Sequence, residues 1–162
     1  MKITPYKFPT NFSQVDDILY RSAQPNEFEI DYMKKEIGLT DIFNVSDNSP
    51  VEATKKEITT AKSLGIKYHA IPTRTDNPIW ENIKQFVDKV NSLKTVNRAK
   101  VLLHCNAGVD RTGTYTLFYQ LINKLKSYTE AVQEMIAKGH IPKDIPKLLP
   151  KIEEYAKKAK LI

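Results

Sequence analysis

The sequence of 162 residues has little cysteine and no long hydrophobic run. Its single cysteine, Cys105, cannot form a disulfide within the chain, and a lone thiol fits a reducing compartment. Prolines and lysines interrupt the first nine residues before a signal peptide can form, and no later run is long enough to span a bilayer. Metal-ligating side chains form no cluster in the sequence. We therefore expect a cytoplasmic protein with no membrane span and no bound metal.

The composition predicts one domain with a surface that attracts anions. Apolar residues make up 41% of the chain, enough for one core but short for two, so we predict a single domain over residues 1–162. The formal net charge is +6, which attracts phosphoesters, nucleic acid or acidic protein segments. A lysine-rich solvated surface is the simpler explanation, so the charge alone selects no partner.

Short apolar runs alternate with helical patterns along the chain. Gly38, Gly65 and Gly139 each follow a helical pattern, where glycine favours the left-handed conformation that ends a helix. Runs of strand length occupy residues 18–20, 41–45, 66–71 and 101–104. The last run is apolar at its first three positions, as in a central strand. This alternation predicts an α/β fold whose largely parallel sheet binds its ligand beyond the carboxyl ends of the strands.

Helix starts are indicated at three places. Residues 49–52 and 127–130 both have the pattern of a capping box, and Pro50 suits the first helical position. Asn77 and Pro78 predict the start of another helix, with an apolar stripe that should face a core. The stripe consists of Ile79, Ile83, Phe86, Val87 and Val90.

The segment 104–113 carries the chemistry. It reads HCNAGVDRTG, follows the predicted central strand and precedes a helical pattern. Such a loop points backbone N–H groups inward and, with the helix dipole, forms an anion site that suits phosphate. The same field, with an arginine beside it, stabilises a thiolate, so we expect Cys105 to be ionised at neutral pH. Arg111 can donate two parallel hydrogen bonds to phosphate oxygens, with a geometry that lysine cannot reproduce.

Three neighbours complete the loop. Thr112 can hydrogen-bond the cysteine sulfur as it leaves, Gly108 allows an unusual backbone angle, and Gly113 allows close packing where the helix begins. A buried, inert cysteine is the alternative interpretation, and the strand-loop-helix context disfavours it.

The pattern His-Cys-x5-Arg-Thr-Gly resembles the signature loop of the cysteine-dependent protein tyrosine and dual-specificity phosphatases. Residues 19–25 are similar to the segment that opens many small dual-specificity phosphatases, and the short chain resembles their compact bacterial-type or phytase-like members. The resemblance implies a three-layer sandwich, a phosphocysteine intermediate on Cys105 and no cofactor. It also implies that His104 lies behind the loop and orients the cysteine. The loop residues that would bind substrate are Asn106, Ala107, Gly108, Val109, Asp110 and Arg111.

Two aspartates compete for the role of general acid. Asp76 lies in the loop 71–78, which resembles the mobile general-acid loop of the family and the Thr-Asp-x-x-Pro loops of bacterial phytases, although Pro78 comes one residue early. Asp110 stands where tyrosine phosphatases commonly have glycine, and it resembles a loop aspartate that has been assigned the acid role in bacterial and lipid-directed relatives. We favour Asp76 because of its loop position.

Three further residues have simpler expected roles. Arg21 could serve the site, but we favour a structural ion pair for it, and we expect His69 to contribute to packing. His140 follows a cap glycine, so we expect it to be exposed.

The predicted activity is hydrolysis of a phosphomonoester. We favour phosphorylated protein over inositol phosphates or phosphoinositides because the variable loop positions carry no lysine, although basic residues elsewhere could line the rim. Those residues are Arg74, Lys55, Lys56 and Lys84. RNA 5′-phosphate, and nucleic acid in general, is a less favoured partner. A non-catalytic phosphate-binding module is disfavoured because the nucleophile, the arginine and a candidate acid are all present. The sequence does not fix the oligomeric state.

Overall fold

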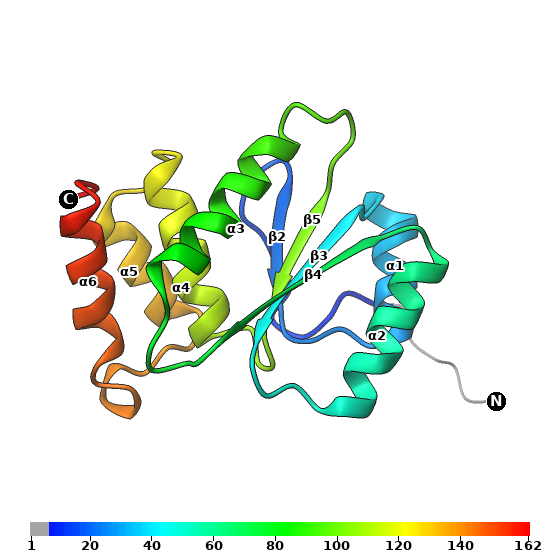
Figure 1. Cartoon of the computed structure of the whole chain (residues 1–162), viewed down its shortest axis with the longest axis horizontal. Coiled ribbons are helices and arrows are strands. Elements are labelled where there is room, and N and C mark those ends of the chain that lie inside the picture. The colour runs from blue at the N-terminus through cyan, green and yellow to red at the C-terminus, as the bar shows by residue number, and fades with distance from the viewer. Residues whose placement is uncertain (1–6) are drawn as a thin grey trace.

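The strands form one sheet in the order β1-β2-β5-β3-β4 in the computed structural model, which describes residues 7–162 (Figure 1). The strands are β1 (Ser13–Gln14), β2 (Leu19–Ser22), β3 (Asp41–Ser46), β4 (Lys67–Thr73) and β5 (Val101–His104). The helices are α1 (Glu27–Ile37), α2 (Val51–Ser63), α3 (Trp80–Leu93), α4 (Asp110–Ile122), α5 (Tyr128–Ala137), the short 3₁₀-helix η1 (Pro142–Asp144) and α6 (Leu148–Lys158). Only β1 is antiparallel to its neighbour, so the predicted α/β fold with a largely parallel sheet is confirmed.

Helices cover both faces of the sheet. Helices α1 and α2 pack over a core that includes Ile42 and Leu102, and α3 to α6 lie over a larger core that includes Phe43 and Leu103 (Figure 1). Successive residues of β3 and β5 therefore enter opposite cores, as expected for strands buried on both faces. These three layers are the predicted sandwich.

Helix α5 begins as its sequence predicts. Ser127 caps it by accepting a hydrogen bond from the backbone N–H of Glu130, and the Glu130 side chain accepts one from the N–H of Ser127. Gly38, Gly65 and Gly139 all have positive φ, which agrees with their predicted places after helices.

Two predicted helix starts are wrong in detail. Helix α2 has Pro50 as its N-cap and no capping side chain, because the hydroxyl of Ser49 donates to the side chain of Asn106 instead. Helix α3 begins at Trp80, two residues after Pro78. The carbonyl of Pro78 accepts a hydrogen bond from Tyr155, at 2.8 Å, which ties this segment to α6.

The apolar stripe of α3 nevertheless faces the core as predicted, except at its first position. Ile79 precedes the helix and is 49% exposed. The other four positions are fully buried; they are Ile83, Phe86, Val87 and Val90.

The carboxyl ends of β5, β3 and β4 lie at one edge of the sheet because the three strands are parallel. The loops that follow them, residues 105–109, 47–50 and 74–79, therefore come together there. Within residues 7–162, no helix has the length and apolar character needed to cross a lipid bilayer. The same residues contain no group of three or more His, Cys, Asp or Glu side chains that could hold a metal ion.

Candidate active site

Cys105 follows the last residue of β5, and its side chain is almost fully buried. Its sulfur accepts hydrogen bonds from the backbone N–H of Gly108, at 3.3 Å, and from the hydroxyl of Thr112, at 3.1 Å. Both contacts place a hydrogen-bond donor against the sulfur. The sulfur therefore lies inside a loop that is arranged to accept negative charge at the start of α4.

Gly108 is required by the way the loop folds over the end of β2. Its φ is +76°, and a Cβ atom there would lie 2.5 Å from the backbone of Ser22 and Ala23. No other residue fits this approach without moving the strand. Arg21 donates from Nη2 to the carbonyl oxygen of Gly108, at 3.1 Å.

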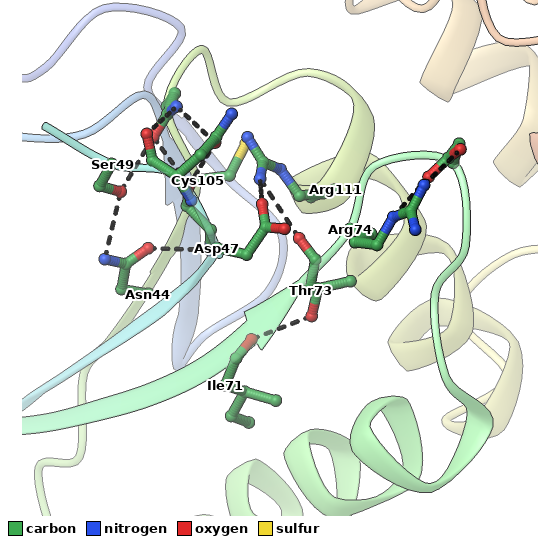
Figure 2. A network of polar contacts seen from close by, with 12 residues as sticks. Asn44, Asp47, Ser49, Ile71, Thr73, Arg74, Cys105 and Arg111 are labelled. Atoms are coloured by element: carbon green, nitrogen blue, oxygen red, sulfur yellow. Dashed lines mark hydrogen bonds and ion pairs between the residues drawn. The ribbon is translucent and has the colours of Figure 1, made fainter.

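The guanidinium of Arg111 lies beside the cysteine loop and is held from one side (Figure 2). Its Nη1 donates to a carboxylate oxygen of Asp47, at 2.7 Å, and to the backbone carbonyl of Thr73, at 3.2 Å. No partner is recorded for Nε and Nη2 among the described residues. These two nitrogens form the edge that can donate two parallel hydrogen bonds to phosphate.

Asp47 was missed by the reasoning from sequence. It directly follows β3, as Cys105 follows β5, and neighbouring parallel strands bring such positions to the same edge of a sheet. That placement is the signal that could have found it. In Figure 2 its carboxylate points toward Arg111, and this ion pair links the start of α4 to the segment after β3.

The side chain of Asn106 faces the segment after β3. Its Oδ1 accepts hydrogen bonds from the hydroxyls of Ser46 and Ser49, both at 2.9 Å, and its Nδ2 donates to Asn48, at 2.9 Å. This side chain fixes the loop, which leaves backbone groups and Arg111 as the donors to an anion. Ala107 is held similarly, because its carbonyl accepts from the side chain of Asn11, at 2.7 Å.

His104 lies behind the loop and is fully buried. Its Nδ1 contacts the carbonyl of Cys105, at 2.9 Å, and because a carbonyl can only accept, Nδ1 carries a proton. Its Nε2 contacts a carboxylate oxygen of Glu57 on α2, which is equally buried. Glu57 also accepts from the side chain of Gln24, at 3.1 Å. A buried hydrogen-bond chain therefore supports the backbone of the cysteine.

Asp76 lies outside this buried part of the site. Its side chain is 52% exposed and forms a two-point ion pair with Arg74, at 3.2 and 3.1 Å. Among the contacts of residues 7–162, none joins Asp76 to Cys105 or Arg111. Asp76 and Asp47 do line the same cleft, which has a volume of about 440 Å³. Figure 2 shows Arg74 turned away from the cysteine loop.

Asp110 is the first residue of α4, and its carboxylate is held by His140. Its Oδ1 lies 2.7 Å from Nδ1 of His140. The expectation that His140 is exposed is wrong, because α5 packs against α4 and places it in the interior, 1% exposed. Its Nε2 has no partner among the described residues.

Arg21 differs from expectation, whereas His69 packs as expected and has a further contact. Arg21 forms none of the ion pairs found among residues 7–162; its partner is the loop carbonyl described above. His69 does pack, stacked on Phe43, but it also contacts Asp41, at 2.9 Å. Although burial raises the pKa of Asp41, hydrogen bonds from His69 and Thr40 outweigh it and lower that pKa below its ordinary value.

Comparison with known proteins places this site in a family. A sequence model described as the tyrosine phosphatase family matches residues 7–133, most of the chain. The chain belongs to the tyrosine phosphatase family. It is 32% identical over 116 residues to the tyrosine-protein phosphatase 69D of Drosophila melanogaster and 29% identical over 105 residues to the inositol diphosphatase DSP3 of Arabidopsis thaliana. These matches cover 70% and 65% of the chain, but the chain spans only 7% and 51% of those relatives.

Solved phosphatase structures share the fold. TpbA from P. aeruginosa, solved in complex with phosphotyrosine, has a TM-score of 0.71 at 14% identity, with 95% of this chain and 96% of that chain covered. The catalytic core of the PP-IP phosphatase Siw14 from S. cerevisiae has a TM-score of 0.71 at 23% identity, with 98% of both chains covered. The family model over residues 7–133 confirms the resemblance of the sequence to tyrosine phosphatases, and the shared fold agrees with it.

Proposed function

We propose that the protein hydrolyses phosphomonoesters through a phosphocysteine intermediate on Cys105. The observation that carries the proposal is the pair of hydrogen bonds on the sulfur, from Gly108 and Thr112, beside the free edge of the Arg111 guanidinium. A stabilised thiolate next to a two-point phosphate donor is the arrangement that nucleophilic attack on phosphorus needs.

The first step transfers the phosphoryl group to sulfur. The thiolate of Cys105 attacks phosphorus in line, the S–P bond forms, and the P–O bond to the leaving group breaks. Nε and Nη2 of Arg111 and the loop N–H groups hold the equatorial oxygens, and an aspartic acid protonates the leaving oxygen. In the second step, water attacks phosphorus with the same carboxylate as general base. Phosphate leaves, the thiolate is restored, and Thr112 donates to it.

We favour Asp76 as the acid. It lines the cleft next to Asp47, where a leaving group would extend from a phosphate bound at Arg111. To reach the leaving oxygen its carboxylate must leave Arg74, and an exposed ion pair of this kind opposes that exchange by only about 0–1 kcal/mol. Asp110 is engaged by His140, which argues for a role in fixing the start of α4.

The favoured substrate is a phosphorylated tyrosine or a dual-specificity protein target. Three carboxylates line the cleft, from Asp47, Asp76 and Asp144, against two cations, from Arg74 and Lys147. This balance accommodates a peptide better than a highly anionic leaving group. The relative named tyrosine-protein phosphatase and the TpbA complex with phosphotyrosine also support a phosphotyrosine substrate.

An inositol phosphate or phosphoinositide is the second candidate. Arg74, Lys147 and Lys151 gather around a neighbouring hollow of about 310 Å³, where a second phosphate group could bind. The relative named inositol diphosphatase and the PP-IP phosphatase Siw14 support this candidate. RNA 5′-phosphate and a non-catalytic binding role have no comparable observation in their favour. The single buried thiol fits a reducing compartment such as the cytoplasm.

Measurements of phosphate release test both the proposed reaction and the proposed substrate. Steady release from para-nitrophenyl phosphate, absent in Cys105→Ser, is the expected result for an enzyme; binding of phosphate without release would establish a non-catalytic module. A panel of phosphotyrosine peptides, inositol phosphates, phosphoinositides and RNA 5′-triphosphate then compares kcat/KM. We expect the phosphotyrosine peptides to give the highest value, and a higher value for an inositol phosphate would reverse the order of the candidates.

A further inference from the structure

The side chain of Arg21 is buried without an ion pair. It is 1% exposed and lies on β2, whose backbone pairs with β5 so that Arg21 lies opposite Leu103. Its only recorded hydrogen bond among the described residues is to the carbonyl of Gly108, and its Nε has no partner. A buried charge of this kind is costly unless something compensates it. A purely structural position would be served better by an apolar side chain.

Compensation comes from the charge of Glu134 on α5, which interacts with Arg21, and from the active-site loop. The carbonyl of Gly108 and the N–H of Val109 belong to one planar trans peptide, so they point in opposite directions. Because Arg21 holds the carbonyl, the N–H of Val109 points away from Arg21, which leaves it able to face a bound anion. The preceding N–H, from Gly108, already donates to the sulfur of Cys105.

Arg21 also interacts electrostatically with Cys105. Burial lowers the pKa of the Arg21 guanidinium, and the charges of Glu134 and Cys105 oppose that shift. Other charged or titratable groups around the loop are Arg111, Asp47, the His104–Glu57 pair and the Asp110–His140 pair. Arg111 is paired with Asp47, whereas Arg21 is not paired with any carboxylate at ion-pair distance within the described residues.

We propose that Arg21 is a positioning residue for the phosphatase reaction: it fixes the Gly108–Val109 peptide in its anion-binding orientation and stabilises the Cys105 thiolate from behind the loop. The inference rests on the proposed function for its catalytic consequence. Two substitutions distinguish the hydrogen bond of Arg21 from its charge. Arg21→Lys keeps the charge but loses the planar guanidinium that reaches the carbonyl. Arg21→Met removes both while keeping much of the side-chain volume.

Alkylation of Cys105 provides a test that does not need turnover. Because Cys105 is the only cysteine, iodoacetamide incorporation measured by mass spectrometry reports on one thiol. We expect the pH midpoint of the alkylation rate to move upward in Arg21→Met and to stay close to wild type in Arg21→Lys. The affinity for inorganic vanadate should fall in both variants, by about tenfold or more, and kcat/KM should fall by about 10²-fold in Arg21→Met, as for loss of one preorganised donor.

Leu19→Ala is the matched control, since it removes a buried side chain from the same strand without touching the loop. It should lower the Tm while leaving the alkylation midpoint and vanadate affinity unchanged. If Arg21→Met lowers only the Tm, like the control, the role of Arg21 is structural and the proposal is wrong. If Arg21→Met does not fold, Arg21→Lys decides: unchanged vanadate affinity overturns the proposal. If the wild type binds vanadate but releases no phosphate, the proposed function fails, while the alkylation and vanadate results still decide the role of Arg21.

Discussion

The cysteine loop and the segment that carries Asp76 lie at the same edge of the sheet but are built differently. Cys105 and Arg111 are at most 7% exposed and are held by contacts from β2, β4 and the segment after β3. Asp76 is 52% exposed, and its recorded side-chain partner is Arg74, two residues away. In the proposed mechanism the groups that bind phosphate are therefore prearranged, whereas the proton comes from a side chain whose recorded partner is a near neighbour in sequence.

This difference matches what the two steps need. Groups that stabilise charge contribute most when they are already oriented before the reaction, because no energy is spent on orienting them during it. An acid that must reach a leaving group can lie on a segment that closes after the substrate binds. Substitutions in the cysteine loop should therefore affect every substrate, and substitutions at Asp76 should affect substrates selectively.

The largest effect is expected for Cys105→Ser. Serine lacks the stabilised thiolate, so phosphate release from any substrate should fall to the background rate, while vanadate binding to the loop persists. Release assays and a vanadate titration check both statements. Retained turnover would show that another group is the nucleophile.

Arg111→Lys should cost about 10²- to 10³-fold in kcat/KM, because lysine keeps the charge but cannot donate two parallel hydrogen bonds. Arg98→Lys is the matched control: Arg98 is exposed in the connection between α3 and β5 and should behave as wild type. Steady-state kinetics with two unrelated substrates checks that the loss is uniform. A rate for Arg111→Lys close to that of the control would mean that Arg111 has a structural role.

Asp76→Asn should show most clearly how the segment with Asp76 differs in function from the cysteine loop. We expect a loss of roughly 10²- to 10⁴-fold in kcat/KM with a phenyl phosphate, whose leaving group needs a proton, and a much smaller loss with a nitrophenyl phosphate. The variant should also lose the basic limb of the pH profile of kcat/KM, because that limb reports deprotonation of the acid. Asp110→Asn is the comparison variant and should change KM more than this limb. If Asp110→Asn alone loses the limb and gains the leaving-group dependence, the acid is Asp110.

Asp47→Ala should have the smallest effect of the four. Removing this partner of Arg111 loses one charged hydrogen bond, so kcat/KM should fall by roughly tenfold for good and poor leaving groups alike. Asp17→Ala, an exposed carboxylate at the opposite end of β5, is the control. If kcat/KM falls only for substrates with poor leaving groups, Asp47 donates the proton rather than positioning Arg111.

The sequence predicts the fold class and the cysteine loop because their signals are local. The alternation of strands and helices predicts the parallel sheet, and the loop between a strand and a helix predicts an anion site before any contact is known. Asp47 could not be found in the same way, because its meeting with Arg111, 64 residues later, depends on which strands are neighbours.

Burial was also hard to predict where it depends on helix packing. His140 follows a glycine after α5 and has no local sign of burial, yet the packing of α5 on α4 places it against Asp110. Ser49 has a capping pattern, but its hydroxyl is used by Asn106, 57 residues away, which only the assembled loop provides. A residue in a capping pattern does not cap its helix when a tertiary partner uses the same hydroxyl.

Trapping the intermediate tests the central claim most directly. Wild-type protein is mixed with a phosphotyrosine peptide, quenched in acid within one turnover, digested and examined by mass spectrometry. The account predicts one added phosphoryl group on the peptide that contains Cys105, and none in the Cys105→Ser variant. Turnover by the wild type with the phosphoryl group on another residue, or on none at any quench time, would contradict it.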